Sequence, residues 1–255
     1  MSEHMSVRTD GGVLHVQFDR PEKRNALTQA MYATVNEALT QASNDEHCRV
    51  VVLSGSETCF TAGNDVKDFM AGGVSADSPV AQFLQLLSTF EKPLVAAVAG
   101  PAVGVGTTML FHCDLVYATA DAKLKTPFVD LALVPEAASS LLMTMYLGYQ
   151  RAAGMLMLGE VLSATDAYAA GLVNQIIPQG ELLATALQKA QQLASRPPAA
   201  VRLTKALMRK THREAVAERL TEEGQLFFER LGSPEAMEAF TAFMEQRKPD
   251  FSSFT

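Results

Sequence analysis

Hydrophobic and polar positions alternate near the start of the chain. Leu14, Val16 and Phe18 are separated by the polar residues His15 and Gln17. A repeat of two residues is typical of a strand with one face in the core. We therefore predict a half-buried strand over residues 14–18.

Longer apolar runs follow it. Residues 50–53 and 94–99 are continuously hydrophobic, which is typical of strands buried on both faces. Residues 115–118 and 173–177 are predicted to be further strands.

Helical spacing fills the segments between these runs. Thr28 is a suitable N-cap for a helix whose buried face would carry Met31, Val35 and Leu39. Residues 80–87 keep the spacing of a second helix. Strands and helices therefore alternate, which indicates an α/β core.

The pattern changes near residue 182, beyond which every segment is helical. We divide the chain into a core over residues 1–195 and a helical region over residues 196–255. The second region carries large apolar side chains, so we expect it to pack on the core or on a neighbouring subunit. Among them are Phe227, Phe228, Phe240 and Phe243.

Composition limits what the protein binds. Of its 255 residues, 48% are apolar, which suffices for a large core. The net charge of −7 and the lack of a run of Lys or Arg argue against a nucleic-acid surface. An anionic ligand would have to be met by local cations. Only 19% of residues are charged, which indicates surface buried between subunits.

Cysteine spacing and segment hydrophobicity bear on the compartment. The three cysteines, Cys48, Cys59 and Cys113, form no metal-binding or disulfide pattern, so we expect reduced thiols and no metal. No stretch has the length of a membrane span, and the first residues lack a signal-peptide core. The last residues do not form the peroxisomal address. We predict a cytoplasmic protein with no membrane partner.

A first glycine-marked loop, F-T-A-G-N-D at 60–65, lies between a predicted strand and a predicted helix. Gly63 allows a tight turn, and Asn64 or Asp65 can cap the helix. Backbone N–H groups at such a turn can point at an anion or a carbonyl oxygen. An ordinary strand-to-helix turn explains the same residues.

A second such loop, G-P-A-V-G-V-G at 100–106, follows a buried run. Gly104 and Gly106 allow close approach of a ligand at a helix start. It is not a dinucleotide loop, because Met109 stands where the third glycine belongs, and the chain has no P-loop. N–H donors from two helix starts can together form an oxyanion hole, which stabilises an enolate by roughly 3 kcal/mol or more.

Four motifs make the chain resemble a known family. They are R-P-E-K-R-N-A-L at 20–27, F-T-A-G-N-D at 60–65, G-P-A-V-G-V-G at 100–106 with C-D at 113–114, and G-L-V at 171–173. In this order they are similar to the crotonase (enoyl-CoA hydratase/isomerase) superfamily over nearly the full length. The resemblance implies an α/β spiral of ββα units with a C-terminal helical region, assembled into homotrimers or hexamers.

The resemblance also implies the ligand. The substrate would be an acyl-CoA thioester, with no separate cofactor. Its carbonyl would lie between the backbone N–H groups of Ala62 and Val105, with Gly104 as the alternative to Val105. The other residues expected to line the substrate are Lys23, Arg24, Ala26, Gly63, Asn64, Asp65, Gly104, Phe128, Arg247 and Lys248.

The C-terminal cations have two interpretations. Arg247 and Lys248 resemble a basic segment of the family, and we expect one of them to meet a CoA phosphate. A solvated basic tail explains the same residues.

Two positions bear on the reaction. The hydratases of the superfamily use two glutamates, and the corresponding positions here are Thr108 and Phe128. Water addition needs one group to activate water and another to protonate the α-carbon. Neither residue can replace a carboxylate, so the resemblance disfavours hydration.

One carboxylate remains in this neighbourhood. L-V-P-E-A-A-S-S at 133–140 and T-P-F at 126–128 resemble the peroxisomal-type Δ3,Δ2-enoyl-CoA isomerases, whose base is the glutamate after the proline. That glutamate is Glu136. The resemblance thus implies an isomerase that moves a 3-enoyl-CoA double bond to the 2-trans position. Without it, Glu136 is explained as a favourable charge at a helix start.

Other interpretations stay open. The chain could be an enoyl-CoA hydratase, catalyse another crotonase-type reaction, or bind acyl-CoA or RNA without catalysis, since a fold alone does not carry function. The acidic balance argues against RNA. Residues 71–80 are a candidate wall of the acyl pocket, but the chain length of the acyl group does not follow from the sequence.

Overall fold

The computed structural model describes residues 2–70, 75 and 77–254. Within that part of the chain, the main sheet has six strands in the order β1-β2-β3-β4-β6-β9. β1 and β2 pair antiparallel, and the other neighbours pair parallel. The bounds are β1 (Met5–Asp10), β2 (Val13–Phe18), β3 (Val50–Ser54), β4 (Leu94–Val98), β6 (Leu115–Ala118) and β9 (Gln175–Ile176). The predicted strands are confirmed, although the last of them is only two residues long.

A second sheet positions the glycine-rich loop. It consists of β5 (Pro101–Val103), β7 (Lys123–Lys125) and β8 (Leu162–Ser163). β5 begins shortly after β4 ends, and Gly100 between them has a φ of 58°. A Cβ there would lie 2.1 Å from the Thr58 carbonyl oxygen, so only glycine lets the chain pass from one sheet to the other.

Helices cover both faces of the main sheet. The predicted cap is confirmed, since the Thr28 side chain accepts a hydrogen bond from the Met31 N–H at 3.3 Å. The helices are α1 (Gln29–Asn44), α2 (Val66–Met70), α3 (Pro79–Thr89), α4 (Val105–Thr108), α5 (Ser139–Leu147), α6 (Tyr149–Leu158), α7 (Ala164–Ala169) and α8 (Leu182–Ala194). The 3-10 turns are η1 (Pro21–Lys23), η2 (Met109–His112), η3 (Val129–Leu131), η4 (Gln179–Glu181) and η5 (Lys210–His212).

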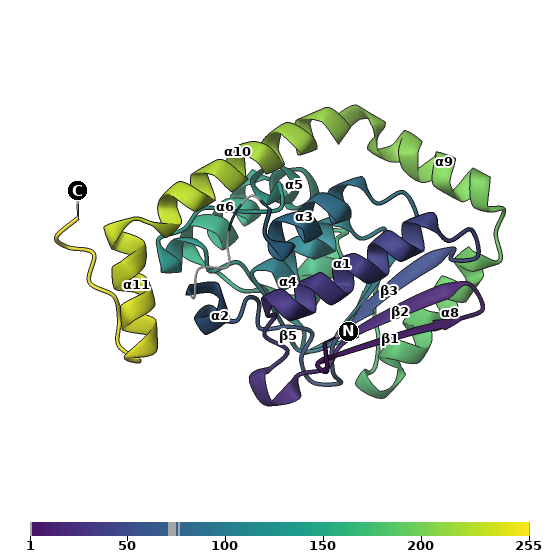
Figure 1. Cartoon of the computed structure of the whole chain (residues 1–255), viewed down its shortest axis with the longest axis horizontal. Helices are drawn as coiled ribbons and strands as arrows, with labels where there is room; N and C mark the ends of the chain where they lie inside the picture. Colours follow the sequence, from purple (N-terminus) through teal and green to yellow (C-terminus); the bar gives the residue numbers. More distant parts are fainter. Residues whose placement is uncertain (1, 71–74, 76, 255) are drawn as a thin grey trace.

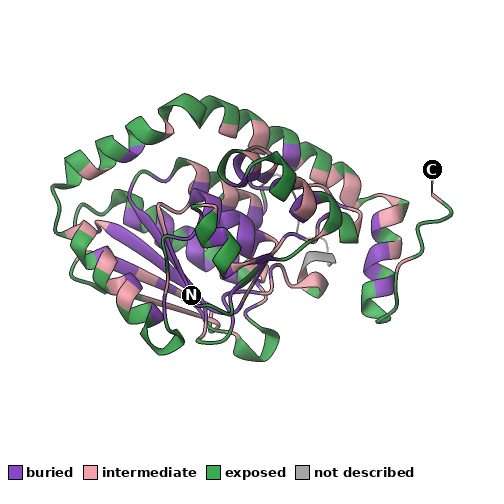
Figure 2. Ribbon diagram, turned by 180° about the vertical axis from the view of Figure 1, so that it is seen from behind, coloured by how far each residue is buried: buried purple, intermediate pink, exposed green. Residues whose placement is uncertain are grey.

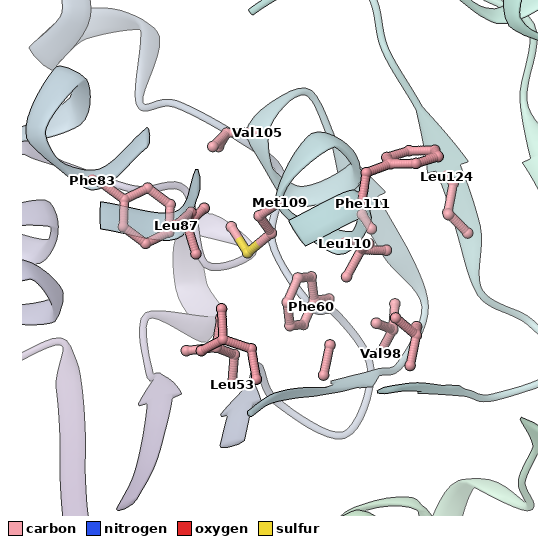
Figure 3. Packing of buried hydrophobic residues seen from close by; sticks show 14 of the residues in the cluster. Leu53, Phe60, Phe83, Leu87, Val98, Val105, Met109, Leu110, Phe111 and Leu124 are labelled. Atoms are coloured by element: carbon pink, nitrogen blue, oxygen red, sulfur yellow. The ribbon is translucent and has the colours of Figure 1, made fainter. Parts of the chain in front are cut away.

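The apolar core lies in two layers around this sheet. The larger layer joins one sheet face to α1, α3 and η2, and the smaller joins the other face to α8. Figure 2 shows the buried strands between exposed helical surfaces. In Figure 3, Phe83 and Leu87 from α3 lie beside Met109 of η2, with Leu53 and Phe60 below. The helix that begins at Val105 therefore packs on the hydrophobic core.

The C-terminal region consists of α9 (Pro198–Arg209), α10 (Arg213–Leu231) and α11 (Pro234–Met244). α9 and α10 run as an arch along one side of the molecule, and α10 contacts α3 and α5 (Figure 1). α8 ends at Ala194, close to the predicted boundary, but the division at residue 195 stays a prediction. Of the proposed acyl-pocket wall, residues 71–74 and 76 lie outside the described residues. Among the described helices, none is long and apolar enough to cross a membrane.

Candidate active site

Asn25 joins the first motif to the second. It is fully buried and has a φ of 56°, and its Nδ2 group donates to the carbonyl oxygens of Cys59 at 2.8 Å and Phe60 at 3.2 Å. Its own carbonyl oxygen accepts from the Thr61 hydroxyl at 2.6 Å. A left-handed backbone is tolerated best by glycine, asparagine and aspartate. The asparagine of the first motif thus fixes the position of loop 60–65.

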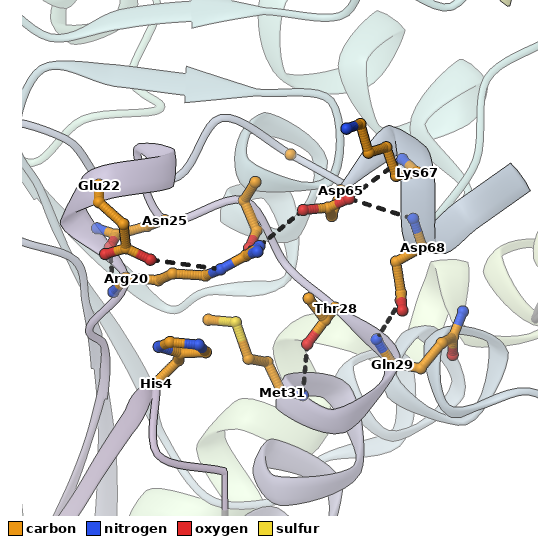
Figure 4. A network of polar contacts seen from close by, with 12 residues as sticks. His4, Arg20, Glu22, Asn25, Thr28, Gln29, Met31, Asp65, Lys67 and Asp68 are labelled. Carbon is orange, nitrogen blue, oxygen red and sulfur yellow. Dashed lines mark hydrogen bonds and ion pairs between the residues drawn. The ribbon is translucent and has the colours of Figure 1, made fainter. Parts of the chain in front are cut away.

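Asp65 holds the same two segments together by charge. Figure 4 shows Arg20 reaching its carboxylate, with a 2.7 Å contact from Nη1 to Oδ2, while the other oxygen accepts from the N–H groups of Lys67 and Asp68. Burial acts to raise the pKa of Asp65, but the hydrogen bond from Arg20 and the other donors outweigh it and hold the pKa below its usual value. The carboxylate of Asp65 is therefore used within the fold, as the capping interpretation predicted.

The two glycine-marked loops pack directly against each other. Thr61 and Ala102 form a parallel bridge, and the Val103 N–H donates to the Thr61 carbonyl at 3.0 Å. A Cβ at Gly63 would lie 2.8 Å from the Val103 carbonyl oxygen, and the φ of Gly63 is 89°. Glycine is required there by both space and backbone conformation.

The backbone donors of these loops differ from the prediction. The Ala62 N–H already donates to the Arg24 carbonyl at 2.9 Å, which contradicts the choice of Ala62 for the oxyanion hole. The Gly104 N–H likewise donates to the Lys125 carbonyl at 2.8 Å, which excludes the alternative to Val105. Among residues 2–70, 75 and 77–254, the N–H groups of Asn64 and Val105 have no hydrogen-bond acceptor.

The incorrect prediction of the Ala62 N–H as a donor has a physical reason. Successive N–H groups of a loop point in different directions, and a motif does not reveal which of them the fold has already paired. Val105 is the first residue of α4, so its N–H has no partner within that helix. Asn64 in the first loop and Val105 in the second therefore each keep an N–H group available to a ligand.

Glu136 is buried and is joined by a hydrogen bond to the helix that begins at Val105. It precedes α5 in a turn where Ala137 and Ala138 have φ values of 62° and 55°. The Thr108 hydroxyl, from α4, donates to its Oε1 at 2.5 Å. Burial raises the pKa of Glu136 to about 8, the hydrogen bond from Thr108 opposes this increase, and the charge of Glu223 adds to it.

Tyr32 connects the first loop with Glu136. This buried tyrosine of α1 donates its hydroxyl to Asn64 Oδ1 at 2.5 Å. Burial raises its pKa well above 10, and the charge of Glu136 raises it further, which places the two side chains in one electrostatic neighbourhood. Tyr32 is therefore a neutral donor that holds the Asn64 side chain.

His112 supports the turn that carries Glu136. It is buried, and its Nε2 lies 2.8 Å from the Ala137 carbonyl oxygen. Burial lowers its pKa to about 4, so the ring is neutral at neutral pH and its Nε2–H donates to that oxygen. The predicted position Phe128 is buried at the start of η3 and offers an apolar ring.

The predicted CoA cations lie at two ends of the structure. Lys23 and Arg24 are exposed in and after η1. Arg247 forms a two-bond ion pair with Glu238, at 2.5 and 2.9 Å, and contacts Glu245 at 2.7 Å. Its charge is thus already matched. Lys248 is exposed and has no ion pair with any described residue.

Sequence reasoning missed Tyr32, Glu223 and the contact made by Thr108. The sequence shows only that position 108 has a threonine and no glutamate, whereas the hydrogen bond of Thr108 depends on the fold. Tyr32 and Glu223 lie in helices far along the chain from Glu136, and no local pattern marks them. No group of His, Cys, Asp and Glu within the described residues is arranged to hold a metal.

Comparisons with known proteins identify the family of the chain. The family model described as enoyl-CoA hydratase/isomerase matches residues 8–253. Enoyl-CoA delta isomerase 2 of Rattus norvegicus is 34% identical over 97% of this chain, which spans only 65% of that protein's length. The 2,3-dehydroadipyl-CoA hydratase of Escherichia coli (strain K12) is 32% identical, over 98% of this chain and 99% of its own.

A solved structure gives the same fold. The enoyl-CoA hydratase/isomerase from Pseudoalteromonas atlantica T6c matches with a TM-score of 0.93 and 40% identity, over 98% of this chain and 100% of that one. The relatives thus include both an isomerase and a hydratase, and the choice between these reactions depends on the site itself.

Proposed function

The chain belongs to the enoyl-CoA hydratase/isomerase family, and we propose that it is an enoyl-CoA isomerase acting on 3-enoyl-CoA thioesters. One observation carries the proposal. Glu136 is a buried carboxyl group with a raised pKa, held by Thr108 on the same short helix that offers the free N–H of Val105. A threonine thus stands where the resemblance expects a hydratase to have a glutamate.

The proposed mechanism uses one base for both proton transfers. The Glu136 carboxylate takes a proton from C2. The electron pair of that C–H bond forms a double bond between C1 and C2, and the carbonyl π pair moves onto the thioester oxygen. The N–H groups of Asn64 and Val105 stabilise the resulting dienolate. The carbonyl double bond then re-forms, and the π pair between C1 and C2 moves between C2 and C3. The π pair between C3 and C4 takes the proton from Glu136 at C4, which leaves the double bond between C2 and C3. The balance needs no water, metal or redox cofactor.

The raised pKa suits this chemistry. A carboxylate with a pKa of about 8 is a stronger base toward a carbon-bound proton than an ordinary glutamate. The active form is the carboxylate, so kcat/KM for isomerisation should increase with pH up to about 8.

Hydration is the second candidate, because the E. coli relative at 32% identity is named as a hydratase. It would need a second group at the substrate to activate water. Thr108 donates its hydroxyl to Glu136 and is no substitute for a carboxylate.

The test is the Glu136→Gln substitution. We expect isomerisation to fall by about 10²- to 10⁴-fold, because the group that carries the proton is lost. Binding of a saturated acyl-CoA, measured by calorimetry, should change little. Asp130→Asn is the control, since Asp130 is a half-exposed carboxylate paired with Lys125.

The assay uses both 3-enoyl-CoA and 2-enoyl-CoA esters of varied chain length. Full isomerase activity in Glu136→Gln would remove Glu136 from the mechanism. Efficient conversion of 2-enoyl-CoA to its 3-hydroxy form by the unchanged protein would favour the hydratase instead.

We also propose assembly into trimers or hexamers in the cytoplasm. Helix α9 supports assembly, since Leu203, Leu207 and Met208 are each about two-thirds exposed, at 65%, 69% and 67%. A pocket of about 500 Å³ lies between this helix and the core. An apolar helix face of this kind is typical of a surface that another subunit covers.

A further inference from the structure

Helix α10 brings a second buried carboxyl group to the turn that carries Glu136. Glu223 is only 4% exposed, and its Oε1 accepts a hydrogen bond from the Ser140 N–H at 2.8 Å. Arg219, one turn earlier, donates to the Ser140 hydroxyl at 2.9 Å. α10 thus contacts the first turn of α5 through two side chains. The two helices lie side by side in Figure 1.

The contact is linked to Glu136 by the backbone. The Ser139 N–H donates to the Glu136 carbonyl at 3.0 Å, and Ser140 is the next residue. The two alanines between Glu136 and Ser139 have left-handed backbones, which are costly unless the surrounding contacts impose them. Glu223 supplies one such contact from outside the turn.

The second oxygen of Glu223 makes its position unusual. Within the described part of the chain, Oε2 is buried and no hydrogen bond of good geometry reaches it. A buried carboxyl oxygen without a well-formed hydrogen bond costs free energy. The negative charge of Glu223 reaches Glu136, where it disfavours a second negative charge.

We propose that Glu223 is a positioning residue for the base: it fixes the Glu136 turn through Ser140, and its buried carboxyl group is paired with Glu136 so that it opposes a negative charge there. This rests on the proposed isomerase function. Glu223 acts on the substrate only through Glu136, so the C-terminal helical region sets the strength of the base in the core.

The other charged and titratable groups around the pair do not replace this role. Tyr32 of α1 and the buried His112 of η2 are both neutral at neutral pH. Arg219 of α10 is positively charged but also pairs with the exposed Glu222 at 3.1 Å. Burial is the first cause of the raised pKa of Glu223. Hydrogen bonds with Ser140 and with the backbone of Ala138, together with the charge of Arg219, oppose the increase.

The test compares Glu223→Gln with Glu222→Gln. Glutamine keeps the acceptor for the Ser140 N–H and removes the charge, so the pKa of Glu136 should fall. The acid limb of the kcat/KM profile should then move down by about half to one pH unit. Glu222→Gln should leave the limb in place, because Glu222 is exposed and its charge is screened.

A third variant separates charge from geometry. Glu223→Ala also loses the acceptor for Ser140, so it should show the same limb shift together with a kcat lowered by about tenfold or more. An unchanged limb in Glu223→Gln would overturn the proposal. A kcat in Glu223→Ala equal to that in Glu223→Gln would show that Glu223 does not fix the turn.

A direct titration keeps this proposal separate from the isomerase proposal. The carboxyl carbon of Glu136 is followed by ¹³C NMR in the ligand-free protein and assigned by its loss in Glu136→Gln. A lower Glu136 pKa in Glu223→Gln supports the pairing even if the protein isomerises nothing. An unchanged Glu136 pKa contradicts the pairing even if the isomerase assay succeeds.

Discussion

The hydroxyl of Thr108 is the hydrogen-bond donor to the proposed base. It donates to Oε1 of Glu136 at 2.5 Å inside the core, where a hydrogen bond to a carboxylate is stronger than one in water. Such a bond favours the charged form of Glu136 and opposes the effect of burial. Thr108 and Glu223 therefore change the pKa of the same base in opposite directions.

The Thr108→Val substitution should reveal this opposition. Loss of the donor disfavours the carboxylate, so the pKa of Glu136 should rise above about 8. The acid limb of kcat/KM should move to higher pH. The rate at pH 7 should fall by about tenfold if the limb moves by one pH unit, because the carboxylate fraction falls in that proportion. Thr108→Ser keeps the hydroxyl and is the control.

A limb that moves down in Thr108→Val would show that Thr108 does not stabilise the carboxylate. A movement of the limb shared by Thr108→Ser would assign the effect to packing rather than to the hydrogen bond.

At the same scale, the sequence predicted some site residues and not others. Glu136 could be proposed as the base because a motif surrounds it and because the residues at 108 and 128 are not acidic. Ala62 was wrong because hydrogen bonding to Arg24, which depends on the folded loop, had already used its N–H. Glu223 sits among exposed charges of one helix, where only tertiary packing distinguishes the buried one.

At the scale of elements, helix α1 does more than cover the sheet. Its Tyr32 packs on Phe83 of α3 and places a hydroxyl at Asn64. The adjacent N–H of Asn64 is one of the two proposed donors to the thioester oxygen. α1 therefore holds one side of the proposed oxyanion hole in place.

The Tyr32→Phe substitution tests this support. We expect kcat to fall by about tenfold with little change in KM, because the donor is misplaced mainly for the dienolate. The acid limb of the pH profile should stay in place, since Tyr32 is neutral in this range. Tyr149→Phe, at an exposed tyrosine, should leave both constants unchanged.

An unchanged kcat in Tyr32→Phe would show that Asn64 needs no support from α1. A rise in KM alone would instead indicate a role in binding the acyl group.

The helices and strands were predictable where their hydrophobic residues follow a regular spacing. The apolar runs of β3 and β4 and the Thr28 cap followed from pattern and capping chemistry. The second sheet did not, because β5 and β7 have three residues each and β8 has two. Strands this short show no alternation, and pairing with distant segments decides them.

At the scale of the whole molecule, the charge balance opposes the proposed binding of CoA. The protein carries a net charge of −7, while CoA presents several phosphate charges. Local cations must therefore supply the attraction. Lys23 and Arg24 lie near one motif, whereas the C-terminal pair was predicted from a resemblance alone.

The structure divides the roles of that C-terminal pair. Arg247 binds both carboxylate oxygens of Glu238 on α11, and the Asp250 N–H donates to the same carboxylate at 2.9 Å. Arg247 thus folds the tail back on its helix. Lys248 has no ion-pair partner among the described residues, so we assign the predicted phosphate contact to Lys248.

Three variants test this division. Lys248→Ala should raise KM for acyl-CoA several-fold at low salt without changing kcat, and added salt should reduce the difference, because an exposed cation acts by screened attraction. Arg247→Ala should instead release the tail from Glu238, seen as faster amide hydrogen exchange at Asp250. Truncation after Met244 should produce both effects and also weaken subunit assembly, measured by sedimentation.

Lys210→Ala, at an exposed lysine between α9 and α10, is the control. If Lys248→Ala binds CoA as tightly as the unchanged protein at low salt, Lys248 belongs to a solvated tail, and the phosphates must be met by Lys23 and Arg24.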